Sequence, residues 1–244
     1  MGEAAIQFSR PLALALSPVL LVQGRAVRRT VPVLPEASGP RTGEVGDAGA
    51  KAYSVLVFGE STAAGVGTDI HEHGLAGGLA RRLVGRHGRV HWAVTGRTGY
   101  TAGRAAEKLL NHVDGRFDLI VVLFGVNDAL ALTSTRRWST DMQALIEGLR
   151  VHLIEHGRII LAGVPQVSSF GALPQPSRAL LGFHARALDR RLGQLARRFV
   201  DVLHVPSPSL TDAAALGGDG FHPSKRGYEL WAAHLSEAVA SDEE

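Results

Sequence analysis

The stretch YSVLVFGES occupies residues 53–61 and joins a continuous apolar run to a Gly-x-Ser turn. An apolar run that does not alternate with polar residues is typical of a strand buried on both faces of a sheet. Similar short runs recur along the chain, and each predicts a further strand. They lie at Val90–Val94, Leu119–Phe124, Ile159–Val164 and Phe199–Val205. The sequence therefore predicts a sheet of five strands that is covered on both faces.

Longer stretches with helical spacing separate these runs. In two of them, leucines recur at intervals of three and four residues, as on one face of a helix. These leucines are Leu75, Leu79 and Leu83 in the first stretch and Leu188, Leu192 and Leu195 in the second. Further helices are expected over 103–113, 140–156 and 224–240. The alternation of strands and helices predicts an α/β fold with a parallel sheet, whose ligands bind at the carboxyl ends of the strands.

Composition excludes several kinds of function. The 244 residues carry 26 Lys and Arg against 23 Asp and Glu, and the basic residues are spread along the chain. Nucleic-acid binding needs them clustered on one face, so we expect no nucleic-acid partner. There is no cysteine, which excludes disulfides, thiolate metal sites and cysteine nucleophiles. The sequence HEH at 71–73 lacks a third ligand nearby, so we expect no metal site.

The first 50 residues differ from the rest. We expect 1–50 to form an apolar segment and a linker ahead of a domain over 51–244. Pro11–Val22 is nearly continuous in apolar residues, but it is shorter than the roughly 20 residues that a spanning helix needs. Three interpretations stay open: packing against the domain, peripheral membrane contact helped by the arginines that follow, and a processed signal peptide. We expect a cytoplasmic protein, with membrane association as the alternative. Pro35–Ala50 is expected to be a loop.

The segment after the first strand admits three interpretations. A dinucleotide fingerprint needs a glycine where Ile70 stands, and a phosphate-binding loop needs a lysine that is absent. A nucleophilic serine on a sharp turn remains, with Gly59 allowing the turn. Ser61 then lies at a helix N-terminus, where backbone N–H groups favour developing negative charge. The alternative is that Ser61 or Thr62 only caps that helix.

Glycines and an amide follow the next two strands. Gly96 and Gly99 allow a backbone N–H to approach a reacting oxygen, although a plain turn is the alternative. In GVND, residues 125–128, Asn127 offers an uncharged amide donor that suits an oxyanion. An ordinary Asn/Asp turn is again the alternative. Asp128 is expected to brace this loop.

The sequence DGFHP, residues 219–223, precedes the last predicted helix. Asp219 and His222 are three residues apart in a loop that contains glycine. A local turn therefore brings the carboxylate to one ring nitrogen and leaves the other nitrogen free. This arrangement fixes the histidine tautomer and stabilises the imidazolium, as in serine-histidine-acid systems. The aspartate at this spacing favours a catalytic role for His222 over a structural one.

Taken in order, the strand–GxS, strand–Gly, strand–GxND and DxxH motifs resemble the SGNH hydrolase family, also called GDSL-type esterases and lipases. The resemblance covers roughly Tyr53 to the C-terminus, and GVND and DGFHP are its most specific parts. It implies a flavodoxin-like three-layer αβα sandwich with a parallel five-stranded sheet. It also implies a serine hydrolase that needs no cofactor or metal and acts on a small-molecule ester.

The resemblance further implies the roles of individual residues. They are Ser61 as nucleophile, His222 as base, Asp219 as its orienting acid, and an oxyanion hole of the Ser61 and Gly99 N–H groups with the Asn127 amide. Gly96 is a weaker candidate than Gly99 for the second donor. This block also departs from the family pattern, because neither Thr95 nor Gly96 is the Asn that the family often has there. Glu60 stands where the family usually has Asp, and its extra methylene shifts a carboxylate that is expected to brace the loop.

Other functions remain open beside this one. An α/β-hydrolase has a similar nucleophile elbow and the same order of Ser, Asp and His. Two facts oppose it: Asp219 and His222 share one loop, and only one apolar stretch precedes Tyr53. The expected activity is hydrolysis of acyl esters through an acyl-enzyme, on small or lipid-like esters that include lysophospholipids and thioesters. A carbohydrate O-deacetylase of the same fold and a non-catalytic binding module are the alternatives.

Overall fold

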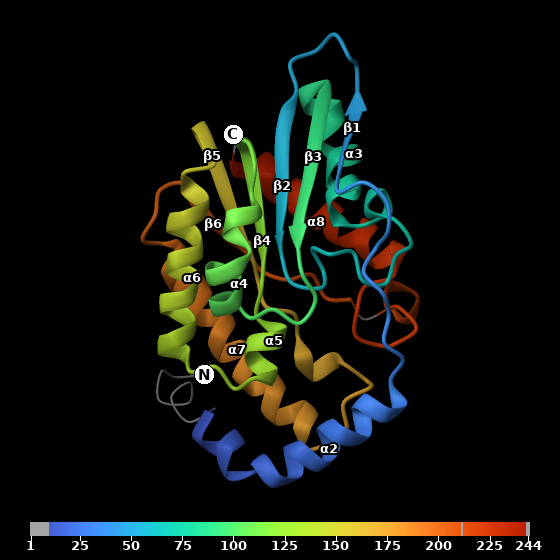
Figure 1. Ribbon diagram of the computed structural model, residues 1–244, viewed down its shortest axis with the longest axis vertical. Coiled ribbons are helices and arrows are strands. Elements are labelled where there is room, and N and C mark those ends of the chain that lie inside the picture. Colours follow the sequence, from blue (N-terminus) through green and yellow to red (C-terminus); the bar gives the residue numbers. More distant parts are fainter. Residues whose placement is uncertain (1–9, 211, 243–244) are drawn as a thin grey trace.

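The computed structural model describes residues 10–210 and 212–242 (Figure 1). Strands and helices alternate along most of the chain. The strands are β1 (Thr42–Gly46), β2 (Tyr53–Gly59), β3 (Arg89–Gly96), β4 (Phe117–Leu123), β5 (Leu153–Ala162) and β6 (Val202–Val205). The helices are α2 (Ser17–Thr30), α3 (Leu75–His87), α4 (Ala102–Lys108), α5 (Val126–Leu130), α6 (Thr135–Arg150), α7 (Ser177–Ala196) and α8 (Lys225–Asp242).

The strands form one mixed sheet in the order β1-β3-β2-β4-β5-β6. The five predicted strands are present and run parallel to one another, with β2 and β4 at the centre. The prediction of a loop over Pro35–Ala50 is wrong at Thr42–Gly46, which forms a sixth strand antiparallel to β3. β1 was missed because it is short, lacks a continuous apolar run and lies at the edge of the sheet.

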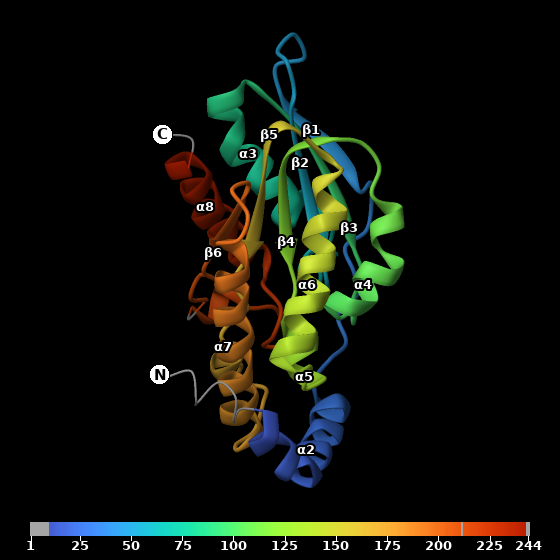
Figure 2. The same ribbon diagram turned by 90° about the vertical axis from the view of Figure 1, so that its left-hand side faces the viewer.

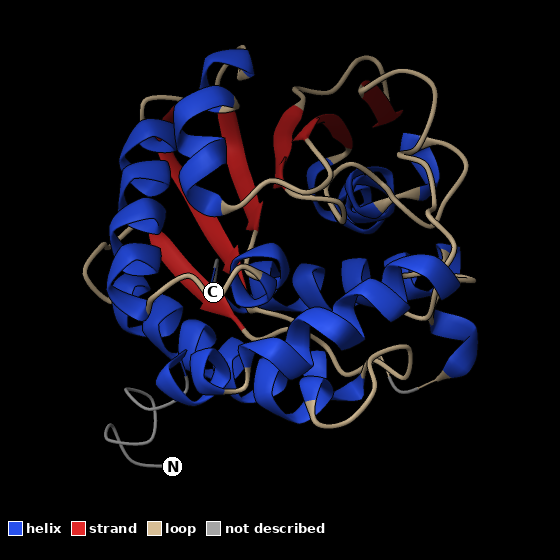
Figure 3. Ribbon diagram, turned by 60° about the horizontal axis from the view of Figure 1, so that its bottom comes forward, coloured by secondary structure: helices blue, strands red, loops and turns tan. Residues whose placement is uncertain are grey.

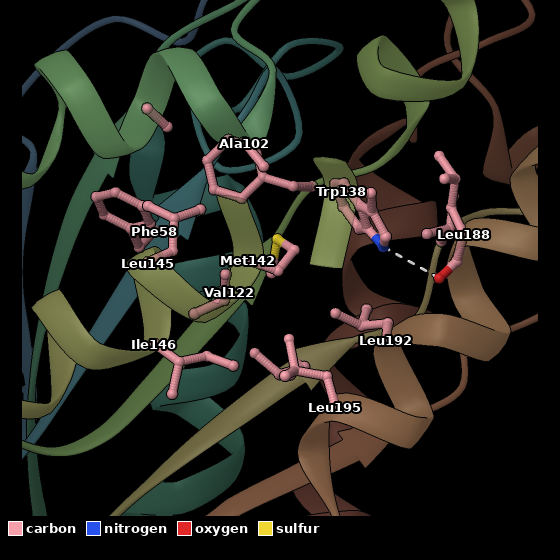
Figure 4. Packing of buried hydrophobic residues seen from close by; sticks show 14 of the residues in the cluster. Phe58, Ala102, Val122, Trp138, Met142, Leu145, Ile146, Leu188, Leu192 and Leu195 are labelled. Carbon is pink, nitrogen blue, oxygen red and sulfur yellow. Dashed lines mark hydrogen bonds between the residues drawn. The ribbon is translucent and has the colours of Figure 1, made fainter. Parts of the chain in front are cut away.

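Helices cover both faces of the sheet, which makes a three-layer αβα sandwich (Figures 2 and 3). One face packs against α3 and α8, and the other packs against α4, α6 and α7. Figure 4 shows the second of these cores, in which Trp138 is fully buried and donates its indole N–H to the carbonyl of Leu188 at 3.1 Å. That bond fixes α6 against α7 and satisfies the one polar atom of a large core side chain.

Local signals account for most element boundaries. Strand β4 reads FDLIVVL and is almost entirely buried, as its β-branched run predicts. Ser134 caps α6 by accepting a hydrogen bond from the N–H of Arg137. The helix expected over 140–156 is too long, because α6 ends at Arg150 and β5 begins at Leu153. Pairing of Leu153 with Phe117 draws this segment into the sheet, although its leucine spacing continues the helical pattern.

The N-terminal helix α2 lies outside the three layers, across the carboxyl end of the sheet and beside α5 and α7 (Figures 1 and 2). Val27 of α2 packs against the buried cluster that lies between the sheet and α4, α6 and α7. No residue of α2 is fully buried. Among the described residues, no helix is both long enough and apolar enough to cross a membrane.

Candidate active site

Three loops converge at the carboxyl ends of the central strands. Ser61 follows β2, Asn127 lies in the short helix after β4, and His222 lies in the loop that leads into α8. β2 and β4 are hydrogen-bonded neighbours, so the residues after them emerge side by side. Gly67, with φ +97°, allows the loops to close: a Cβ there would lie 2.2 Å from the carbonyl oxygen of Pro223.

Ser61 begins an irregular turn. The expectation that Ser61 lies at a helix N-terminus is wrong, because residues 61–67 form successive turns and α3 starts only at Leu75. The Ala64 N–H donates to the carbonyl of Glu60 at 3.0 Å, and the Val66 N–H donates to that of Ser61 at 3.1 Å. These two bonds make a local helical turn at Ser61, which lacks the dipole of a long helix.

Ser61, His222 and Asp219 form a continuous hydrogen-bonded chain. The Nε2 atom of His222 lies 2.9 Å from Ser61 Oγ, and its Nδ1 atom lies 2.6 Å from Asp219 Oδ2. The serine and the histidine are 161 residues apart in sequence, whereas the aspartate and the histidine share one tight loop. The predicted nucleophile, base and acid are thus brought together within bonding distance.

The DGFHP loop is built to hold the carboxylate of Asp219. Its Oδ1 atom accepts hydrogen bonds from the N–H groups of Phe221 at 2.9 Å and His222 at 3.0 Å. Burial raises the pKa of Asp219, but the bond from the His222 ring and the two backbone N–H groups outweigh burial and hold it below its usual value. Asp219 is therefore ionised at neutral pH and keeps Nδ1 of His222 protonated.

Glu60, the residue that departs from the family pattern, is buried behind Ser61 at 4% exposure. Its carboxyl oxygens accept hydrogen bonds from the N–H groups of Val126 and Asn127, both at 3.1 Å, and from Asn127 Nδ2 at 2.6 Å. Burial raises the pKa of Glu60 to about 8, although the Asn127 N–H favours the ionised form. The expected brace thus joins the nucleophile turn to the loop after β4.

The side chain of Asn127 lies on the wall of the same pocket as Ser61. Its amide nitrogen has two hydrogens and two acceptors, Glu60 at 2.6 Å and the carbonyl of Tyr100 at 3.2 Å. The longer bond is the weaker one and is the one that an oxyanion can replace. Sequence patterns placed Asn127 correctly beside Ser61 but did not reveal that both of its hydrogens are shared.

The two candidate glycines after β3 differ in their surroundings. Gly99 is exposed in the turn before α4, has φ +79°, and is not among the residues that line the pocket around Ser61. Its neighbour Tyr100 supplies the carbonyl that contacts Asn127, so the loop does reach the site. Gly96 is buried, and a Cβ on it would lie 2.6 Å from the N atom of Ala64. Gly96 therefore serves close packing against the Ser61 turn.

Two buried residues hold the site in place: Tyr228, which sequence analysis did not single out, and Asp128, which it expected to brace the loop after β4. The buried hydroxyl of Tyr228 on α8 donates to the carbonyl of Val66 at 2.7 Å and ties that helix to the turn after Ser61. Asp128, also buried, accepts from the N–H of Ala102 at 3.0 Å and so joins α5 to the start of α4. Burial raises the pKa of Asp128 to about 6. The sequence offers no signal for the partner of Tyr228, because it lies 162 residues away.

An apolar pocket of about 130 Å³ opens beside Ser61 and His222. Its walls come from the β5–α7 region, from α5 and from the loops that precede α8. The apolar side chains among its lining residues are Val126, Leu130, Pro165, Phe170, Pro208, Leu210, Leu216, Phe221, Pro223 and Trp231. Within the described part of the chain, no group of three His, Asp or Glu residues is placed to hold a metal ion. His73 of the HEH sequence instead contacts Asp69 at 2.8 Å.

Comparison with known proteins assigns the chain to a family. The sequence model of the GDSL-like lipase/acylhydrolase family matches residues 57–230. The chain belongs to this family. It is thus a GDSL-type hydrolase, related to esterases and lipases. A search of curated protein sequences gave no match.

Several solved structures share the fold of this family member. TesA superposes with a TM-score of 0.60 at 18% identity, covering 77% of this chain and 98% of TesA. A member of the lipolytic G-D-S-L family from Veillonella parvula gives 0.59 at 18% identity, with 77% and 98% covered. The psychrotrophic esterase EstA from Pseudoalteromonas sp. gives 0.57 at 14%, with 77% and 97% covered. At such low identity these similarities establish the fold.

Proposed function

We propose that this hydrolase is a serine esterase that cleaves acyl esters through an acyl-enzyme on Ser61. The observation that carries the proposal is the 2.9 Å contact between His222 Nε2 and Ser61 Oγ at the mouth of an apolar pocket. A nucleophile within bonding reach of a base, with the base held by a buried acid, is the arrangement that acyl transfer requires. The apolar lining suits the hydrocarbon part of an acyl group.

The reaction follows from the hydrogen-bonded chain. His222 Nε2 takes the proton of Ser61 as Oγ attacks the ester carbonyl carbon, and Asp219 stabilises the resulting imidazolium. The imidazolium then protonates the departing alkoxide, so that the alcohol leaves and an ester of Ser61 remains. A water molecule next gives a proton to His222 and attacks that ester, which releases the acid and returns the proton to Ser61.

The negative charge on the tetrahedral oxygen needs donors that are already in place. We assign this role to the Ser61 N–H and to the hydrogen of Asn127 that Tyr100 accepts at 3.2 Å. Glu60 holds the other hydrogen at 2.6 Å and so keeps the amide from turning away. Gly99 becomes a third donor if the exposed turn before α4 closes over bound substrate.

The pocket favours a short acyl group. Its volume of about 130 Å³ is well below the roughly 300 Å³ at which pockets for drug-sized ligands begin. We therefore expect acetyl to butyryl esters to be better substrates than long-chain esters. Apolar side chains contribute the larger part of the pocket surface, which favours an acyl esterase over a carbohydrate deacetylase, although Gln166, Ser169, Ser207 and Ser209 also line the pocket.

The test combines active-site labelling with a substrate series. A fluorophosphonate probe should attach to Ser61 in the wild type and not in Ser61→Ala, as mass spectrometry of the labelled peptide reports. p-Nitrophenyl esters of increasing chain length, together with acetylated sugars, should give the highest kcat/KM for short simple esters. A protein that hydrolyses none of these esters and leaves Ser61 unlabelled would refute the proposal.

A further inference from the structure

We propose that α2 docks the enzyme on a bilayer that contains anionic lipid, with the active-site edge of the molecule beside the lipid surface. The proposal concerns where the protein binds and does not depend on the chemistry at Ser61. It rests on three features of residues 10–30: an exposed apolar surface, a run of exposed arginines without acidic residues, and a fixed position next to the substrate pocket.

The outward side chains of the N-terminal segment are strongly apolar. Leu21 and Val22 on α2 are 61% and 67% exposed, and Leu12 in the preceding helical turn is 47% exposed. Leu20 and Val27 are partly buried, and Val27 packs against the core of the domain. Exposed side chains of this size, gathered in one segment, mark a surface that binds a partner.

Positive charge follows the apolar side chains along the same helix. Arg25, Arg28 and Arg29 are all exposed, and no Asp or Glu occurs between Arg10 and Pro35. None of the described ion pairs involves these three guanidinium groups. A helix that turns apolar side chains and several arginines outward suits the boundary between acyl chains and anionic headgroups.

Specific contacts fix α2 to the catalytic edge of the domain. Gln23 accepts hydrogen bonds from the hydroxyl of Ser177 at 2.5 Å and from its N–H at 3.2 Å, and its own amide donates to the carbonyl of Gln175 at 2.6 Å. Upstream, Arg10 donates to the carbonyl of Leu132, which follows α5, at 2.8 Å. The apolar and basic side chains therefore keep a set orientation relative to the pocket.

The chain leaves α2 along the rim of the active site. The side chain of Leu34 lies against Gly217 in the loop before Asp219, and the Ala37 N–H donates to the carbonyl of Ala64 at 3.0 Å. Leu130, which lines the substrate pocket, is itself 46% exposed. A bilayer bound to α2 would thus lie next to the pocket. An ester in that bilayer would then lie close to Ser61.

Vesicle sedimentation tests the proposal directly. The full chain should bind vesicles of equal parts phosphatidylcholine and phosphatidylglycerol, bind pure phosphatidylcholine more weakly, and dissociate as salt is added. Arg28→Glu with Arg29→Glu should weaken binding at least about tenfold, since each arginine near the surface contributes on the order of 1 kcal/mol. Leu21→Asp with Val22→Asp should abolish binding.

Matched variants provide the controls. Arg82→Glu with Arg198→Glu, and Val200→Asp, change exposed residues elsewhere and should bind like the wild type. The α2 variants and the surface controls should hydrolyse soluble p-nitrophenyl acetate at the wild-type rate. Ser61→Ala should lose activity but still bind vesicles, which separates docking from catalysis. A wild-type protein that does not sediment with anionic vesicles would overturn the proposal. So would controls that lose binding equally, or a dimer in solution that Leu21→Asp with Val22→Asp dissociates.

Discussion

The Asn127 amide nitrogen has two hydrogens, and both are already donated, one to Glu60 and one to the carbonyl of Tyr100. The oxyanion of the proposed mechanism is a third acceptor that competes for them. Replacing Asn127 with alanine removes a donor that acts mainly in the transition state. We expect kcat for p-nitrophenyl acetate to fall about 100- to 1,000-fold, with little change in KM. Steady-state kinetics measure this, and an unchanged kcat would rule out a role for Asn127 in the oxyanion hole.

In the proposed mechanism, Asp219 acts through the histidine and does not touch the substrate. In Asp219→Asn the amide no longer stabilises the imidazolium and favours the wrong tautomer, so we expect kcat to fall about 10,000-fold. Ser61→Ala should cost more, since it removes the nucleophile itself, on the order of a millionfold. Both variants are compared on the same ester at the same pH. Equal losses would mean that Asp219 does more than orient His222.

Motifs located the central side chains of the site because their chemistry is local. Asp219 and His222 are three residues apart, so a turn alone brings them together. The contact between Glu60 and Asn127 was not predictable in the same way, since it depends on the length of the glutamate and on the pairing of β2 with β4. Gly99 shows the opposite case: the motif names it, and the structure leaves it outside the pocket lining.

Among the helices and strands, α8 is held to the nucleophile turn by one buried hydroxyl. Tyr228→Phe keeps the ring packing but leaves the Val66 carbonyl without its donor. We expect the free energy of unfolding to fall by about 1–3 kcal/mol. Because Val66 accepts this bond within the Ser61 turn, kcat should fall as well. Urea unfolding followed by circular dichroism gives the stability, and an unchanged midpoint would contradict the proposed tie.

Elements with a clear hydrophobic period were predicted well, and those decided by neighbours were not. α3 carries Leu75, Leu79 and Leu83 as expected, and the buried strand β4 matches its apolar run. β1 has no such run and exists because its backbone pairs with β3. The boundary between α6 and β5 was also missed, since strand pairing competes there with helical spacing.

Taken as a whole, the molecule should lose stability as pH rises through neutrality. Burial raises the pKa of Glu60 from 4.5 to about 8 and that of Asp128 from 3.8 to about 6. At a pH between the ordinary and the raised pKa of each group, the folded state binds more protons than the unfolded chain. The free energy of unfolding therefore falls from about pH 5 to about pH 8. Each group contributes at most about 1.4 kcal/mol per pH unit. Urea midpoints measured across this range test the trend.

The variant Glu60→Gln isolates the larger contribution. Glutamine does not titrate, so the fall in stability above about pH 6 should flatten. The amide nitrogen of the glutamine is a donor, and it must face an N–H group from which Glu60 now accepts a hydrogen bond. The variant should therefore be less stable than the wild type at pH 5. Glu107→Gln, at an exposed position on α4, is the matched control. A slope equal to that of the wild type would assign the pH dependence to other groups.

The 161 residues between Ser61 and His222 have a consequence for biosynthesis. A ribosome delivers the serine, all six strands and every described helix except α8 before it delivers the imidazole. On the proposed mechanism, the hydroxyl of Ser61 has no base until the last loop has emerged and α8 has docked. We therefore expect copies that terminate before His222 to lack hydrolytic activity.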